Sequence, residues 1–187
     1  MDSSSIPILE NIPIFSLTLP TPLPTNLLAV FLNWPRDKRG ILELAQVSRD
    51  KLIRSTREQA TLPVRATNIS EYLAHALQIE EILSTNPDIK STEEDKVRWR
   101  QSPIVIPKFL DRCFPGIFFS NEILHLIFYK GIVLMDSAKC KFSENCPDDA
   151  IHDLREAAGI FQFLSQDHFR TSGTKSIPVE FNPNLFN

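Results

Sequence analysis

Glycine, cysteine and histidine are all scarce in this chain of 187 residues, which contains 5, 3 and 4 of them respectively. The glycines are isolated, so they cannot form a phosphate-binding loop, whose backbone must approach its ligand closely. Three cysteines cannot all pair and are too few for a disulfide framework. The N-terminus has no apolar run long enough for a signal peptide. These absences predict a protein of a reducing, cytoplasmic compartment rather than a secreted one.

Extreme charge is absent as well, because the formal net charge is only −3 and 42% of the residues are hydrophobic. Such a composition predicts a folded chain rather than a disordered one. The most hydrophobic stretch, residues 116–138, nearly has the length of a membrane span but contains Glu122, His125, Lys130 and Asp136. Charged residues are costly inside a bilayer, so this stretch is expected to be a buried helix.

Proline is plentiful, with 14 residues, and unevenly placed. Because proline lacks an N–H donor and favours extended backbone before it, residues 1–36 are predicted to be an extended, proline-rich segment with edge strands. The six prolines of this segment are Pro7, Pro13, Pro20, Pro22, Pro24 and Pro35.

The rest of the chain shows the three- and four-residue periodicity of helices, so the expected fold class is mainly α. Residues 37–170 are predicted to form one helical domain, and residues 171–187 a loosely held tail. The segment from 97 to 107 is bracketed by prolines and is expected to be a strand or irregular. The expected helices are 37–58, one that stops at Asn86, 120–141, and one that begins at Pro147 and continues to about Leu164. The second is expected to begin near Asn68, whose side chain can cap it with Glu71 three residues on.

The first helix has a predicted core stripe of Ile41, Leu44, Ala45, Ser48 and Leu52, and its other faces are strongly basic. Residues 36–65 contain eight cations and four acids, although the pI of the whole chain is near 5.8. Clustered positive charge attracts phosphates and carboxylates, but the acidic pI argues against nucleic acid. We expect contact with an acidic protein or a weak contact with an acidic membrane surface, carried by Arg49, Lys51, Arg54 and Arg57.

No group of residues has the spacing of a catalytic, cofactor-binding or metal-binding site. Cys140, Cys146 and His152 follow one another at intervals of six, whereas zinc ligands usually include a tight C-x-x-C or H-x-x-x-H pair. Cys113 has only Arg112 beside it to activate its thiol and is expected to be a buried apolar residue. The sequence therefore predicts a protein that is not an enzyme and carries no cofactor.

The last helix carries the most specific pattern. Its expected core stripe is Ile151, Leu154, Ala158 and Phe161, joined by Ala157 and Leu164. Its small residues 157–159 should let a neighbouring helix approach closely. Together with Lys96 and Trp99 upstream, the segment DDAIHDLREAAGIFQFL, residues 148–164, resembles the "AAGIF" helix of BRO-type domains. This is the family of Alix, Brox and the fungal vacuolar sorting and pH-response scaffolds, and the resemblance is closest to the Brox-like branch.

The resemblance extends from Leu44 to Phe169. It implies a helical scaffold built of tetratricopeptide-like hairpins, without enzymatic activity, that acts in ESCRT-dependent protein transport at the endosome. In the family, a surface patch binds the C-terminal helix of a charged multivesicular body protein of ESCRT-III. That patch lies in helices that follow the "AAGIF" segment, so no binding residue transfers to this chain, which is expected to be a partial domain. The alternative is a small helical adaptor that binds acidic lipid or protein through the basic helix 36–58.

Overall fold

Residues 21–91, 99–100 and 119–165 are described in the computed structural model of the chain. Their structure is mainly helical, as the sequence predicts. The helices are α1 (Leu27–Val30), α2 (Arg39–Arg57), α3 (Leu62–Thr85), α4 (Ser120–Ser143) and α5 (Pro147–Ser165), with a 3-10 turn at Arg36–Lys38. The strands are β1 (Thr21–Pro22), β2 (Phe31–Leu32), β3 (Lys90–Ser91) and β4 (Trp99–Arg100).

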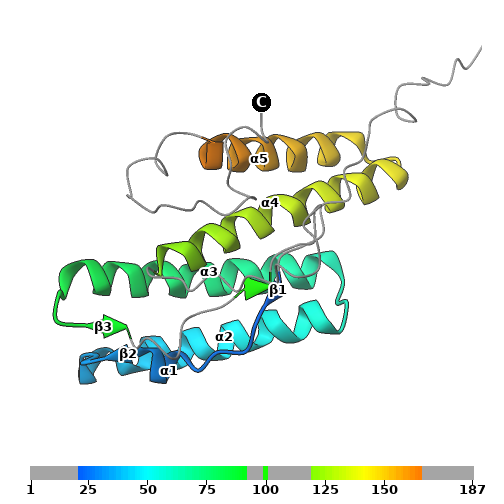
Figure 1. Cartoon of the computed structure of the whole chain (residues 1–187). Coiled ribbons are helices and arrows are strands. Elements are labelled where there is room, and N and C mark those ends of the chain that lie inside the picture. Colours follow the sequence, from blue (N-terminus) through cyan, green and yellow to red (C-terminus); the bar gives the residue numbers. More distant parts are fainter. Residues whose placement is uncertain (1–20, 92–98, 101–118, 166–187) are drawn as a thin grey trace, which may run out of the picture.

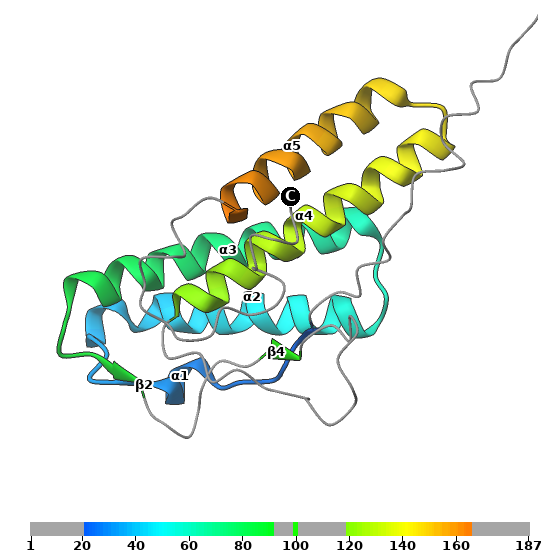
Figure 2. The same cartoon turned by 45° about the horizontal axis from the view of Figure 1, so that its top comes forward.

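The four long helices form a layered array in the order of the sequence. Each runs antiparallel to the one before it, with α2 at one end of the array and α5 at the other (Figure 1). The turn between α4 and α5 projects beyond the ends of α2 and α3 (Figures 1 and 2). Helix α4 therefore has neighbours on two sides, whereas α5 packs mainly on α4.

Helix α2 agrees closely with the predicted helix 37–58. Its buried face includes Leu42, Ala45 and Leu52, which are separated by three and then seven residues and so lie on one side of a helix. Two expectations for this helix are wrong. Leu44, placed in the core stripe, is exposed, and Arg49, placed on a polar face, is buried.

Helix α3 begins six residues earlier than the predicted start near Asn68. Thr61 precedes it and Pro63 stands in its first turn, where the fixed backbone angle of proline suits a helix and its missing N–H costs nothing. Asn68 lies inside the helix, so the capping pattern read from Asn68 and Glu71 is accidental. The predicted end is confirmed, because Asn86 caps the helix.

The N-terminal segment is extended only in part. Strand β1 pairs with β4 and β2 pairs with β3, both antiparallel. Between β1 and β2, α1 forms a single helical turn in the proline-free run Leu27–Leu32, where the Asn26 side chain accepts a hydrogen bond from the N–H of Leu28 (3.1 Å). Residues 1–20, most of 97–107 and the predicted tail 171–187 lie outside the described residues.

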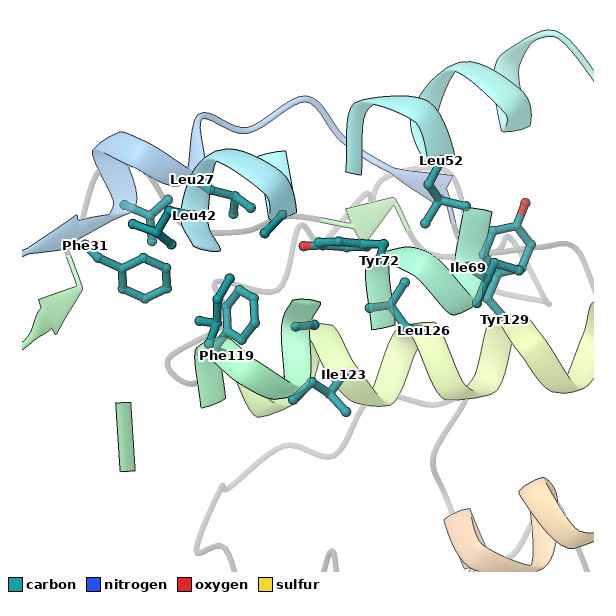
Figure 3. Close-up of a cluster of buried hydrophobic side chains, with 14 of the residues drawn as sticks. Leu27, Phe31, Leu42, Leu52, Ile69, Tyr72, Phe119, Ile123, Leu126 and Tyr129 are labelled. Carbon is teal, nitrogen blue, oxygen red and sulfur yellow. The ribbon is translucent and has the colours of Figure 1, made fainter. Parts of the chain in front are cut away.

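The main core lies between α1, α2, α3 and the first half of α4. Figure 3 shows its aromatic and aliphatic side chains converging from these helices. Phe119 is one of them, and its ring packs edge-on to that of Phe31 with 5.7 Å between centroids. The fully buried side chains Tyr72, Leu126 and Tyr129 bring α3 and α4 into this core.

A second, smaller core lies on the other side of α4. It contains Phe128, Ile132 and Leu164, and Phe161 packs against it. The predicted stripe of α5 is wrong for Ile151, Leu154 and Ala158, which are exposed. It is confirmed for Ala157 and Leu164, which are buried together with Ala150 and Asp153.

The close approach of α4 and α5 depends on a different glycine from the one expected. No heavy atom lies within 4 Å of the position that a Cβ would occupy on Gly159, so this residue faces open space. At Gly131 of α4, the same Cβ would lie 2.9 Å from Cζ of Phe161 and 3.1 Å from Cγ2 of Ile160. Gly131 therefore provides the space for the side chains of α5.

Candidate functional site

The four cations predicted to contact an acidic partner do not share one environment. Lys51, Arg54 and Arg57 are exposed on α2, whereas Arg49 is fully buried. Lys51 forms an ion pair with Glu71 of α3 (Nζ to Oε1, 2.8 Å). Arg54 and Arg57 form no ion pair with any residue that the structure describes. Only these three cations are available to a surface partner.

Arg49 belongs to a buried polar cluster at the centre of the main core. Its Nε donates to Oε1 of Glu122 on α4 (3.0 Å), and the same oxygen accepts a hydrogen bond from the hydroxyl of Tyr72 on α3 (2.7 Å). One carboxylate therefore joins α2, α3 and α4. A buried charge needs such partners, because an unpaired one costs several kcal/mol.

The surroundings of Arg49 and Tyr72 raise the pKa of both side chains. Burial alone would lower the pKa of Arg49, but the adjacent Glu122 carboxylate outweighs this effect and raises it. Burial raises the pKa of Tyr72 well above its usual range, and the charge of Glu122 raises it further. Arg49 therefore stays charged and Tyr72 stays a hydrogen-bond donor at neutral pH.

Arg49 also holds the N-terminal segment on the bundle. Its Nη1 donates to the backbone carbonyl of Leu23 (2.6 Å), and nearby the side chain of Gln46 accepts a hydrogen bond from the N–H of Leu27 (2.7 Å). The cluster thus links the N-terminal segment to α2, α3 and α4. Because Arg49 is fully buried, it cannot contact a partner.

The surface part of α2 is a strip of apolar and basic residues, which we call the α2 strip. Leu44 and Val47 are 56% and 54% exposed, and Lys51 and Arg54 follow at helical spacing on the same side. Gly40 precedes them, with no atom within 4 Å of its would-be Cβ. Large apolar side chains rimmed by charge are typical of interaction surfaces.

Helix α5 carries a comparable strip on its exposed side, which we call the α5 strip. Ile151 and Leu154 are 39% and 40% exposed, Asp148 precedes them, and Arg155 and Ala158 follow. The opposite edge of the helix is tied to α4 by ion pairs. Lys130 pairs with Glu156 (2.7 Å), and Lys141 pairs with Asp153 (2.7 Å).

The described cysteines and the Ser48–His75 pair do not form a catalytic or metal-binding site. Cys140 and Cys146 are free and exposed, and among the described residues no group of three or more histidines, cysteines or acids could hold a metal ion. Ser48 Oγ lies 3.0 Å from Nδ1 of His75, but Ser48 is fully buried and also bonds the carbonyls of Leu44 and Ala45. A buried, helix-bonded hydroxyl cannot attack a substrate. Cys113 lies outside the described residues.

The signal for the buried arginine was present in the sequence. Leu42, Ala45, Arg49 and Leu52 follow the spacing of one helical face, so the period alone places Arg49 inside. Arginine is almost never fully buried unless it is paired, and the sequence does not reveal Glu122, 73 residues away, as its partner. The exposure of Leu44 follows from the same pattern, because it falls outside that face.

Comparison with known proteins adds no assignment. No protein-family model matches the chain, and no curated protein or solved structure is significantly similar to it. None of the described helices has both the length and the apolar character needed to cross a membrane.

Proposed function

We propose that the chain is a non-catalytic scaffold of BRO type that binds other proteins in ESCRT-linked transport, in the cytoplasm and at the endosome. The observation that best supports a scaffold is the open helical array, in which α2 and α5 both expose large apolar side chains next to charged ones. The family and the ESCRT link rest on the resemblance of residues 148–164 and of the order of the elements, and they stay predictions.

The test is a pull-down with the C-terminal helix of a charged multivesicular body protein as bait. Enrichment of the chain over a bait with the same helix scrambled would support the ESCRT link and would require a surface other than the family's patch, which does not transfer to this chain. Leu154→Asp serves as a companion variant, because it changes the exposed side of α5 without touching the buried clusters. Equal recovery on both baits would remove the ESCRT link and leave a scaffold with another partner.

A second function is favoured by the three exposed cations of α2. In this function the chain is a helical adaptor, and Lys51, Arg54 and Arg57 contact acidic lipid or an acidic protein. Liposome flotation with anionic and neutral vesicles tests the lipid form. Binding should weaken as salt rises, because the Debye length falls from about 10 Å at 0.1 M to about 3 Å at 1 M. Flotation that is the same with both vesicle types would rule out the lipid form.

A further inference from the structure

The turn between α4 and α5 carries two of the three cysteines of the chain. Cys140 lies in the last turn of α4, and Cys146 is the residue directly before α5. Both thiols are free and exposed. The turn projects beyond the ends of α2 and α3 (Figure 2), so small molecules in solution can reach both cysteines.

Backbone hydrogen bonds fold this turn back over the end of α4. The N–H of Asn145 donates to the carbonyl of Phe142 (3.1 Å), and the N–H of Cys146 donates to the carbonyl of Lys141 (2.8 Å). Asn145 has a left-handed backbone, with a φ of 61°. This combination is a Schellman motif, in which the residue after the left-handed one packs against a side chain of the last helical turn. The positions that make this contact are here Lys141 and Cys140.

The thiol of Cys146 also points towards the end of α4. Its Sγ lies 3.7 Å from the backbone carbonyl oxygen of Glu144. Glu144 follows Cys140 by four residues, the spacing of neighbours on one side of a helix, and its N–H donates to the carbonyl of Cys140 (3.0 Å). The fold of the turn and the direction of this thiol therefore both bring Cys146 towards Cys140.

We propose that Cys140 and Cys146 form a reversible disulfide bond across the α4–α5 turn when the chain meets a peroxide. Hydrogen peroxide oxidises one thiol to a sulfenic acid and is itself reduced to one water. The other thiol then attacks the sulfenic sulfur and releases a second water. In sum, two S–H bonds are replaced by one S–S bond, and one peroxide becomes two waters.

The bond is accessible to reductants as well. A thiol such as glutathione can attack an exposed disulfide, and two glutathione thiols supply the two electrons and two protons that restore both cysteines. The low cysteine content of the chain predicts a reducing compartment, in which disulfides are usually transient and redox-sensing. The pair is thus a site of reversible modification, not a permanent cross-link.

Oxidation should strengthen the attachment of α5. This helix packs mainly on α4, where the buried apolar cluster is small. A cross-link at the turn removes conformations that are open to the chain only when the end of α4 and the start of α5 separate. The oxidised chain is therefore expected to open α5 less often than the reduced chain.

The test uses the full chain with Cys113→Ala, which leaves Cys140 and Cys146 as its only thiols. After reduction and removal of the reductant, a slight excess of hydrogen peroxide should lower the mass of the chain by two hydrogen atoms and leave no free thiol. Trypsin cuts after Lys141, between the two cysteines, and should release two peptides joined by the disulfide. Cys140→Ser and Cys146→Ser in the same background are matched controls and should give no such product.

Glutathione buffers measure how well the fold holds the two thiols together. The oxidised fraction at each ratio of oxidised to reduced glutathione gives the equilibrium constant for forming the disulfide. This constant should be about tenfold larger in the folded chain than in strong denaturant. That factor corresponds to the low end of the stabilisation that disulfides give, because the closed loop is short.

Hydrogen exchange followed by mass spectrometry measures the effect on α5. Exchange at the start of this helix should slow several-fold on oxidation and recover with reduced glutathione, whereas Cys146→Ser should not respond to peroxide.

Four results would each overturn the proposal. They are oxidation that yields only cross-linked dimers or sulfinic acid, an equilibrium constant no larger in the folded chain than in denaturant, a disulfide of the unmodified chain that contains Cys113 instead, and equal exchange of α5 in both redox states. None of these results depends on whether an ESCRT-III helix binds.

Discussion

The two sides of α4 are held by different kinds of interaction. Towards α2 and α3, Glu122 pairs with Arg49 in a fully buried cluster surrounded by a large apolar core. Towards α5, the apolar cluster is small, and the ion pairs Lys130–Glu156 and Lys141–Asp153 lie at the edge of the contact, with their lysines partly exposed. We therefore expect the packing of α4 on α2 and α3 to contribute more to the stability of the chain than the packing of α4 on α5.

The largest effect is expected from breaking the buried pair. Arg49→Met leaves the Glu122 carboxylate buried without its cation, which should lower the free energy of unfolding by about 3–5 kcal/mol. Urea unfolding measures this loss. As a control, the triple variant Arg49→Met, Glu122→Leu, Tyr72→Phe removes every charged or donating member and should recover most of the stability. A single Arg49→Met variant as stable as the unmodified chain would show that the pair is unimportant.

Matched truncations on the two sides of α4 should differ in how far their effects extend. Leu126→Ala and Leu164→Ala each leave a cavity at a buried position, which should lower the free energy of unfolding by about 2–5 kcal/mol. Hydrogen exchange followed by mass spectrometry separates them. Leu126→Ala should speed exchange throughout α2, α3 and α4, whereas Leu164→Ala should speed it in α5. The same exchange pattern in both variants would mean that the two sides unfold as one unit.

Gly131 and Gly159, on the two helices of the α4–α5 contact, should respond in opposite ways to an added methyl group. Gly159→Ala adds a methyl group in open space and should stabilise α5 by about 1 kcal/mol through helix propensity. Gly131→Ala drives its methyl group against Phe161 and Ile160, and should instead destabilise the chain by about 1–3 kcal/mol. Thermal unfolding of both variants checks the opposite signs. A stabilising Gly131→Ala would show that Phe161 moves aside freely.

The smallest expected effect is the loss of stability at low pH that comes from Asp153, at the edge of the α4–α5 contact. Burial of Asp153 opposes its ionisation, but the ion pair with Lys141 and other polar and charged neighbours outweigh burial and lower its pKa. A carboxyl group whose pKa is lowered by folding stabilises the fold above its unfolded value of about 3.9, and this contribution disappears as pH falls through the lower, folded value. Urea unfolding between pH 7 and pH 2 should therefore show a smaller acid loss for Asp153→Asn than for the unmodified chain. Equal losses would mean that Asp153 is not coupled to folding.

The sequence predicted the long helices because their apolar periodicity is local information. The predicted boundaries at Ser120, Pro147 and Asn86 agree with the structure to within a residue or two. The predicted start of α3 near Asn68 is wrong, because Pro63 also suits the first turn of a helix and local rules do not rank it against the capping pattern at Asn68.

The side-chain environments were harder to predict because they depend on distant residues. Burial of Arg49 needs Glu122, and the face of α5 that packs is fixed by Gly131 of α4, the residue that lets Phe161 approach. The α2 strip could be predicted only for its cations, because Leu44 was counted in the core. The family and the partner stay predictions.

The link between Arg49 and Glu122 has a consequence for the order of events during synthesis. When α2 and α3 have been made, Arg49 and Tyr72 already point into the space between them, but their common acceptor belongs to a helix that is still to come. Before α4 is made, Arg49 can already donate to the Leu23 carbonyl, but neither Arg49 nor the Tyr72 hydroxyl has its carboxylate acceptor. Packing of α4 supplies this acceptor and its share of the main core, so we expect a growing chain to gain much of its stability only after α4 has been made.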